Sequence, residues 1–475
     1  MAQQRTRGGT GQAISICELA FDAWRRPTGD GLNDQELALA LADYACENAF
    51  THVALLRAGE GGPEDPTGHF AQVAHDRTPD DLIFLVDSLH QAGIGVIVDG
   101  LPGPYAGPAD EHAEFDAGRW QIGSQLRSNV LFWLDRYHID GLHFAALDTM
   151  LYLDYGRRPG EWRANRYGGK ENLAAVDFLR ELNTTISRDY PGVFTIAAGV
   201  SGWPMVSGAV QQGGLGFSLV QSSGWPGAIL GYLRNDPWFR KFHHDQLTES
   251  VVHAFDENAV LALSFDTPDQ VHGPGALLEQ MPGDAWQRRA GLRGLFGYMW
   301  AHPGKKLLRM GAEFGMLAGQ HKSKAGEAER ARVDSEDWGG LWRWVGDLNR
   351  LYCSQPALHA LDFDAAGFLW IEANDRENSV LSFLRCARDG SPVLVVCNFT
   401  PVLRTNYVVG VPAHKMWREA LNSEASIYGG SGAGNFGRAE AMPVPAHGQP
   451  MSLALTLPPH GVLFFVPEDD GSATL

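Results

Sequence analysis

Residues Tyr137 to Tyr155 read YHIDGLHFAALDTMLYLDY, and this stretch decides the fold. Its apolar run is closed by Asp140-Gly141 and followed by short apolar residues as far as Ala146. This pattern predicts a buried strand whose carboxyl end opens into a loop. In an α/β barrel, functional residues lie in the loops at the carboxyl ends of the strands. A functional site is therefore expected where this strand ends.

Strand and helix patterns alternate on both sides of this stretch, up to about residue 350. Strand-like residues cover 14–24 and 51–56, helical spacing covers 32–50 and 78–91, and an apolar strand runs from Gly95 to Val98 and ends at Asp99. Such alternation predicts a parallel sheet with helical crossovers. The chain is long enough for all units of a (β/α)8 barrel, the TIM barrel, so the predicted fold class is α/β.

The pattern changes at about Leu361, where short apolar segments separated by Gly, Pro, Asn and Asp begin. They are FLWIEA, VLSFLRC, PVLVVCNF, YVVGV, SLALTL and VLFFV. Short strands of this kind are typical of an antiparallel β-sandwich domain. We expect a disordered lead over residues 1–12, the barrel over 13–355, the all-β domain over 356–468 and a tail over 469–475.

Charge and composition exclude several classes of partner. Asp and Glu number 56 against 38 Lys and Arg, a formal charge of −18, which argues against nucleic acid or an anionic membrane surface but allows a neutral polymer. The five cysteines are odd in number and lack CxxC spacing, and the histidines show no metal-ligand spacing, so we expect no disulfide framework, metal or cofactor. No apolar run approaches the length of about 18 residues that a membrane span requires, so we expect no membrane insertion and a cytoplasmic location.

The opening stretch resembles the strand that carries the catalytic nucleophile in glycogen (α-1,4-glucan) branching enzymes of the α-amylase superfamily, where the pattern is roughly YHIDGLRVDAVASMLYLDY. Further matches follow in the same order, from about Ile14 to Val466, among them EWRANRYGGKENL (161–173), MPGDAWQ (281–287) and YMWAHPGKKLLRMGAEFG (298–315). The resemblance implies retaining transglycosylation by a nucleophilic carboxylate and a general acid. It also implies that the family's usual N-terminal carbohydrate-binding module is missing, because the match starts almost at the first barrel strand.

Laid on the family pattern, the positions that carry the chemistry hold other residues. The nucleophile falls at Ala145 and its neighbouring arginine at His143. Branching enzymes read TIAEES where this chain reads TIAAGV, so the general-acid position falls at Ala198, with Gly199 at the adjacent glutamate. The third acid falls at Asp266 when the LSFDTPDQVHG segment is aligned from its left end, and near Asp269 when it is aligned from its right end.

Other residues of the same loops are candidates for ligand binding. Asp99 is retained from the family pattern, but Pro104 stands at a substrate-binding histidine and Glu64 at a tyrosine that stacks under the sugar. Flat aromatic faces bind pyranose rings, so aromatic residues of segments expected to flank the site join the candidates. The full candidate set is Asp99, Asp266, Glu64, His143, Trp162, Tyr167, Trp203 and Trp225.

Three functions remain compatible with this pattern. The first is a catalytically inactive, branching-enzyme-like protein that binds a glucan, another polysaccharide or a partner enzyme of polysaccharide metabolism. The second is an active glycosidase or transglycosylase with a rebuilt site that uses some of Glu64, Asp99, Asp148 and Asp266 on a different glycan. Two carboxylates about 5 Å apart, or roughly 6.5–9.5 Å for inversion, would favour it, and a pocket filled by Phe144, Phe265 or Pro104 would count against it. The third is a structural subunit of a polysaccharide-synthesis complex.

Overall fold

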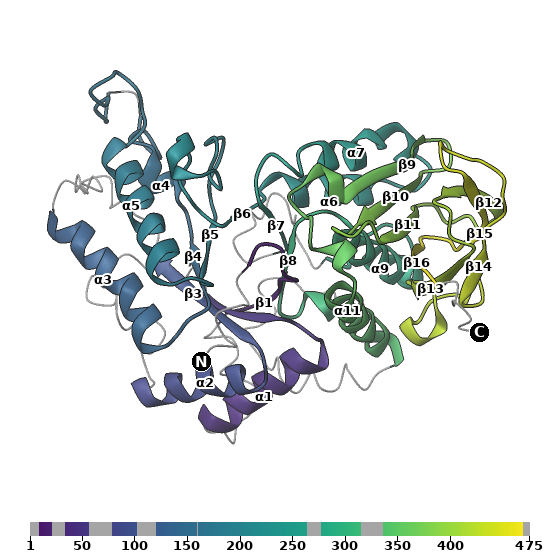
Figure 1. Ribbon diagram of the computed structural model, residues 1–475, viewed down its shortest axis with the longest axis horizontal. Coiled ribbons are helices and arrows are strands. Elements are labelled where there is room, and N and C mark those ends of the chain that lie inside the picture. The colour runs from purple at the N-terminus through teal and green to yellow at the C-terminus, as the bar shows by residue number, and fades with distance from the viewer. Residues whose placement is uncertain are drawn as a thin grey trace.

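The computed structural model describes residues 9–20, 34–56, 78–101, 120–158, 160–263, 277–314 and 336–468. Within these ranges, parallel strands close into a barrel and antiparallel sheets follow beside it (Figure 1). The predicted α/β barrel and C-terminal all-β domain are both confirmed. No helix in these ranges is both long enough and apolar enough to span a membrane.

Eight strands make the barrel, each paired in parallel with the next, and the last strand pairs with the first. The closing register sets Glu18 opposite Arg309. The strands are β1 (Ser15–Ala20), β2 (His52–Leu56), β3 (Gly95–Leu101), β4 (Gly141–Phe144), β5 (Phe194–Ala197), β6 (Leu219–Gln221), β7 (Ala259–Leu263) and β8 (Lys305–Arg309). All carboxyl ends therefore meet at one rim of the barrel.

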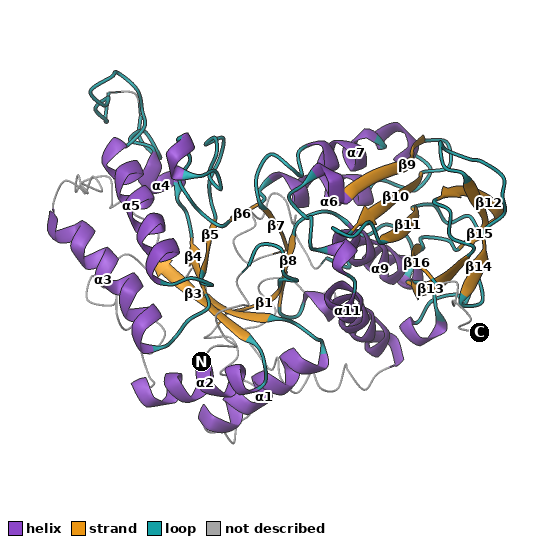
Figure 2. Cartoon of the chain, in the orientation of Figure 1, coloured by secondary structure: helices purple, strands orange, loops and turns teal. Residues whose placement is uncertain are grey.

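The helices lie outside this ring of strands (Figure 2). They are α1 (Asp34–Glu47), α2 (Pro79–Gln91), α3 (Trp120–Arg136), α4 (Asp148–Leu151), α5 (Leu173–Asp189), α6 (Gly224–Arg234), α7 (Asp245–Val252), α9 (Ala285–Ala301) and α11 (Glu336–Ser354). Helix α2 begins where the sequence predicts. The Thr78 side chain accepts a hydrogen bond from the Asp81 N–H, and the Asp81 carboxylate accepts one from the Thr78 N–H, which is a capping box.

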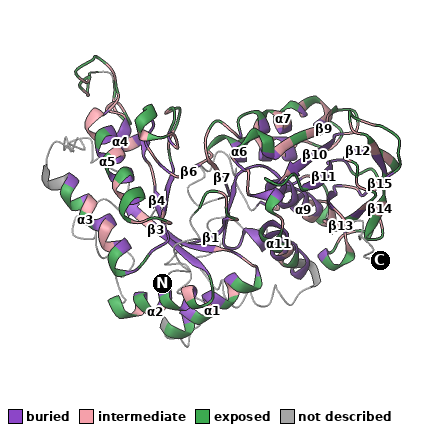
Figure 3. Cartoon of the chain, viewed as in Figure 1, coloured by how far each residue is buried: buried purple, intermediate pink, exposed green. Residues whose placement is uncertain are grey.

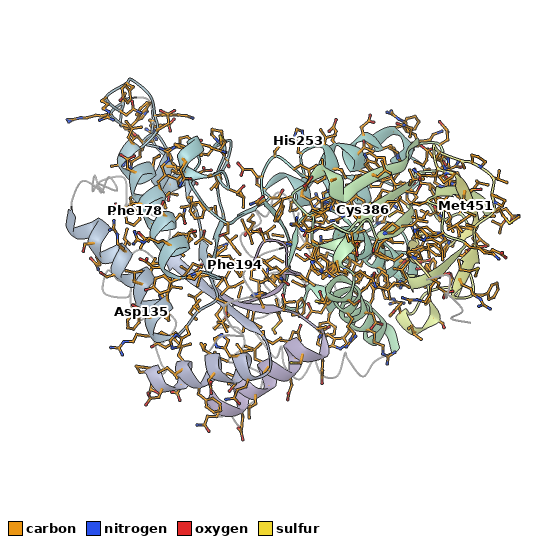
Figure 4. All side chains as sticks on the ribbon, viewed as in Figure 1. Asp135, Phe178, Phe194, His253, Cys386 and Met451 are labelled. Carbon is orange, nitrogen blue, oxygen red and sulfur yellow. The ribbon has the colours of Figure 1, made fainter. Side chains whose placement is uncertain are left out.

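Side chains on each barrel strand alternate between two apolar layers. Ile16, Ile97 and Ile196 belong to the cluster inside the barrel, whereas Leu142 and Phe144 belong to the cluster between strands and helices. Figure 4 shows the two positions, with Phe194 among the strands and Phe178 on α5 outside them. This alternation decides which residues at the strand ends point into the rim.

The all-β domain has a six-stranded antiparallel sheet in the order β14-β13-β16-β11-β10-β9 and a two-stranded sheet of β12 and β15. Its strands are β9 (Phe368–Asp375), β10 (Val380–Cys386), β11 (Pro392–Asn398), β12 (Arg404–Val411), β13 (Met416–Asn422), β14 (Arg438–Glu440), β15 (Met451–Leu457) and β16 (Val462–Pro467). The sequence missed β13 and β14, because neither carries a continuous apolar run.

Barrel and all-β domain share buried contacts. Helix α9 is buried along most of its length (Figure 3), and it packs on β16 so closely that a Cβ added to Gly297 would lie 2.9 Å from the Val462 Cβ. The buried carboxylate of Asp362 bonds both Lys305 Nζ, at 2.9 Å, and Arg385 Nη2, at 2.7 Å, and Arg385 also donates to the Ala301 carbonyl at the end of α9. Removing one partner from a buried ion pair of this kind strongly destabilises the folded protein.

Candidate functional site

The barrel rim brings together the ends of β3, β4 and β6 through the side chain of His143. Its Nδ1 lies 3.1 Å from Asp99 Oδ1 on β3, and its Nε2 lies 3.3 Å from Gln221 Oε1 on β6. The His143 side chain is 1% exposed and that of Asp99 is 18% exposed. The structure therefore joins two of the predicted ligand candidates, Asp99 and His143, and adds Gln221, which the sequence did not single out.

This arrangement fixes the imidazole at both ring nitrogens. The Nδ1–H donates to the Asp99 carboxylate, and the amide of Gln221 can face Nε2 as acceptor or as donor, according to the rotation of its end group. The carboxylate of Asp99 is thus held by the side chain of the neighbouring strand. The contact engages Oδ1, and a carboxylate can accept more than one hydrogen bond.

Ala145 and Ala198 follow β4 and β5 at the same rim. Ala145 is half-buried and Ala198 is buried. Gly199 has φ +62°, and a Cβ added to it would lie 2.8 Å from Ala146 Cα. This contact is with backbone, so a side chain at position 199 would require the β4 loop to move, whereas position 198 already carries a Cβ. This backbone therefore excludes a side chain at position 199, whereas position 198 carries the methyl group of an alanine.

The loops after β4 and β5 are bonded to each other along their backbones. The Leu147 N–H donates to the Ala198 carbonyl at 3.1 Å, and the Asp148 N–H donates to the Gly199 carbonyl at 2.8 Å. The Asp148 carboxylate accepts the Ser201 N–H at 2.9 and 3.0 Å. Asp148, considered as a replacement acid, therefore binds backbone and holds these loops together.

The aromatic candidates divide by exposure. Trp203, in the loop after β5, is half-buried and its ring centroid lies 5.5 Å from that of Tyr152. Tyr167 is exposed, with the guanidinium of Arg166 over its ring. The half-buried Trp162 lies in the same loop between α4 and α5. Trp225 is only 4% exposed and belongs to the core. Its ring is therefore unavailable for sugar stacking.

Several predicted residues lie elsewhere. Phe144 does not fill the rim, because its ring points outward and contacts Phe217, with centroids 5.3 Å apart. That result removes one argument that the sequence offered against a rebuilt site. Glu64, Pro104, Phe265, Asp266 and Asp269 lie outside the described residues.

Two buried acids near the rim were missed by the sequence reasoning. Glu18 on β1 is buried opposite Arg309, and burial lowers the pKa of Arg309 to about 10 although the charge of Glu18 opposes the shift. Glu313, in the 3-10 helix η4 (Ala312–Phe314), accepts hydrogen bonds from the Tyr44 hydroxyl and the Gly311 N–H. Burial raises the pKa of Glu313 to about 7. An acidic residue inside an apolar strand, as in SICELA, was the available signal for Glu18.

In the described part of the chain, no group of three or more His, Cys, Asp or Glu side chains is placed to hold a metal ion. At the described rim, Asp99, His143 and Gln221 are joined by hydrogen bonds, and Trp203 makes an aromatic contact with Tyr152.

The fold is similar to that of known proteins of the α-amylase type. The family model described as "Alpha amylase, C-terminal all-beta domain" matches residues 370–468. Among solved structures, an α-amylase from Geobacillus thermoleovorans superposes with a TM-score of 0.63 at 14% identity, over 97% of this chain and 100% of that one, which shows the shared fold. A trehalose-6-phosphate hydrolase from Bacillus licheniformis also superposes with a TM-score of 0.63, over 96% of this chain and 99% of that one.

Sequence identity to the proteins found by sequence comparison is much higher. A 1,4-alpha-glucan branching enzyme of Aromatoleum aromaticum is 53% identical, over 96% of this chain and 76% of the relative. The corresponding enzyme of Aquifex aeolicus is 45% identical, over 95% of this chain and 76% of the relative. Identity at this level over nearly the whole chain establishes common descent, and the chain belongs to the 1,4-alpha-glucan branching enzyme family.

Proposed function

We propose that this protein binds an α-1,4-glucan at the barrel rim without the double-displacement chemistry of a branching enzyme. The observation that carries the proposal is the pair of methyl groups at Ala145 and Ala198, where the family pattern places the nucleophile and the general acid. Retaining transfer needs a carboxylate to form the glycosyl-enzyme bond and a second carboxyl to protonate the leaving oxygen. Neither methyl group can do so.

The described rim supports binding better than it supports replacement chemistry. Asp99 is engaged by His143 at 3.1 Å, and Asp148 is engaged by the Ser201 N–H. Of the acids considered for a rebuilt site, both that the structure describes are thus already hydrogen-bonded within the protein. Removing members of a catalytic set commonly lowers the rate by several powers of ten, since the members act together.

A glucan surface remains available around the bonded loops. The hydrogen bonds between the β4 and β5 loops hold Trp203 and Tyr152 in place, and the Tyr152 hydroxyl also donates to the Ser201 carbonyl at 3.2 Å. Preorganised aromatic groups bind sugar at a low entropic cost. The relatives are named for action on 1,4-alpha-glucan, which supports this polymer as the ligand.

The proposal is tested by a branching assay and glycogen affinity electrophoresis on the same purified chain. We expect no new α-1,6 linkages and clear retardation in the glycogen gel. An Ala145→Asp/Ala198→Glu variant tests whether the scaffold still holds substrate productively, and Ala145→Asn/Ala198→Gln is its uncharged control. Branching by the wild type that a point change in its own rim abolishes would overturn the proposal. Absence of retardation would instead favour a protein partner or a structural role in a synthesis complex.

A further inference from the structure

A second surface of the molecule carries exposed aromatic rings that the barrel rim does not use. In the connection from α6 to β7, Trp238 is 75% exposed, Phe239 59% and Phe242 69%. These three side chains, here called the aromatic patch, fall within the five residues WFRKF. Large aromatic side chains are usually buried, and apolar patches that stay exposed mark binding surfaces.

The backbone under the aromatic patch is firmly anchored. Arg240 lies between the exposed rings in sequence but is itself buried, and its guanidinium donates to the carbonyls of Leu233, Asn235 and Phe399 at 2.7, 3.1 and 2.7 Å. His244 Nε2 lies 3.0 Å from the Ala373 carbonyl on β9. Because the segment is fixed to both the barrel and the all-β domain, its rings are held outward as part of the fold.

The aromatic patch and the barrel rim lie at different ends of the barrel strands. The patch precedes β7, and η3 (Arg240–His243) and α7 lead into the amino end of that strand. The loops that hold Ala145 and Ala198 follow the carboxyl ends of β4 and β5. A ligand bound to the aromatic patch therefore occupies a site separate from the rim.

The charges beside the aromatic patch favour a neutral ligand. Lys241 pairs with Glu377 at 2.8 Å, and Arg376 pairs with Asp245 at 2.7 Å. The Asp236 carboxylate accepts a hydrogen bond from the backbone N–H of Trp238 at 2.9 Å. Burial lowers the pKa of the neighbouring His244, which favours its neutral form. Basic side chains that are already paired give little attraction to an anion. The exposed rings of Trp238 and Phe239 offer apolar faces, and the Phe242 ring has the Lys241 ammonium 5.3 Å from its centroid on one side.

We infer that the aromatic patch is a second binding site for a neutral α-glucan chain, whose pyranose rings contact Trp238, Phe239 and Phe242 through their apolar faces. The ligand class rests on the proposed function, but the site is separate from the rim. A polymer long enough to reach both sites would be held more tightly than by either alone, because the second contact becomes intramolecular.

The test is glycogen affinity electrophoresis of the full chain and of a Trp238→Ala/Phe239→Ala/Phe242→Ala variant. We expect the variant to bind glycogen about tenfold or more weakly, since each lost ring contact contributes a factor of several. The control is a Phe436→Ala/Met442→Ala/Val444→Ala variant, which removes three exposed apolar side chains from the all-β domain. It should bind as the wild type does. Thermal unfolding curves of the triple variant and of single Trp238→Ala and Phe242→Ala variants, compared with that of the wild type, check that the fold is kept.

The outcomes separate this inference from the proposed function. Unchanged glycogen affinity in the triple variant would overturn the patch as a glucan site and leave the rim proposal standing. Equal weakening in the control variant would also overturn it. A concentration-dependent dimer in sedimentation that only the patch variant loses, without a change in glucan affinity, would assign the patch to a second copy of the chain instead. Branching activity in the wild type would overturn the proposed function alone.

Discussion

Nδ1 of His143 lies 3.1 Å from Oδ1 of Asp99, across the neighbouring strands β3 and β4. His143 is buried and Asp99 is partly buried at the barrel rim, and the imidazole bonds a carboxylate that the family pattern retains. This contact joins the ends of β3 and β4 through their side chains.

Replacing His143 with Ala should lower the free energy of unfolding by about 1–3 kcal/mol, because a hydrogen bond to a partly buried carboxylate is lost. Urea denaturation measures the change. The matched control is His253→Ala, since His253 makes the same kind of contact with Asp256 at 2.9 Å but both side chains are exposed. An exposed pair contributes little, so the control should change stability by less than about 0.5 kcal/mol. Equal effects would contradict a special role for the pair of His143 and Asp99.

Gly199→Ala should destabilise the protein more than Gly202→Ala. Both glycines lie in the loop after β5 with φ near +62° and +70°, so the backbone strain of an alanine is similar at the two positions. Only position 199 adds a contact of 2.8 Å with the Ala146 backbone, whereas a Cβ at 202 meets nothing within 4 Å. We expect about 1 kcal/mol for Gly202→Ala and at least about twice that for Gly199→Ala in thermal unfolding. Similar values would show that the two loops separate readily.

Asp362→Asn should destabilise the chain by about 3–5 kcal/mol, because Lys305 and Arg385 would remain buried without their shared carboxylate. Burial acts to raise the pKa of Asp362, but Lys305 and Arg385 outweigh it and the net pKa is lowered. The stabilisation is thus present above the ordinary aspartate pKa and is lost as pH falls through the lowered value. Guanidinium denaturation of wild type and variant tests this. Glu440→Gln, which alters an exposed pair with Lys415, serves as control.

Glu313 should make the protein less stable as pH rises from about 4.5 to about 7. Burial raises its pKa from 4.5 to about 7, so the folded protein binds a proton that the unfolded chain releases in this interval. The loss of stability is roughly 3 kcal/mol across the interval. Comparing unfolding free energies of wild type and Glu313→Gln at pH 5 and pH 8 isolates this contribution. A pH dependence that is unchanged in the variant would contradict the assignment.

The sequence predicted the features that local patterns determine. Alternating strands and helices gave the barrel, and the helical spacing over residues 78–91 gave α2, which begins at Pro79. Asp99 and His143 were candidates because they end neighbouring strands. The sequence could not supply Gln221, which reaches His143 from a strand 78 residues away, or the backbone contact that excludes a side chain at Gly199.

Exposure was equally hard to predict. Trp225 was a candidate for sugar binding, yet it packs into the core beside His302, with ring centroids 6.1 Å apart. Trp238 carried no signal of function, although it is largely exposed. Beside Trp238, the buried side chain is that of Arg240, whose guanidinium donates to the carbonyl of Phe399 in the all-β domain. Such long-range contacts decide which rings face water, and spacing along the chain does not reveal them.

The most direct test of the account is the number of α-1,6 linkages that the purified wild-type chain forms on a linear α-1,4-glucan. Debranching and chain-length analysis of the product provide the measurement, and a close branching-enzyme relative provides the positive control. With methyl groups at Ala145 and Ala198, we predict no linkages above the level of a sample without protein. Linkages that accumulate with time and disappear in an Asp99→Asn variant would contradict the central claim and show that the rim has retained or rebuilt its chemistry.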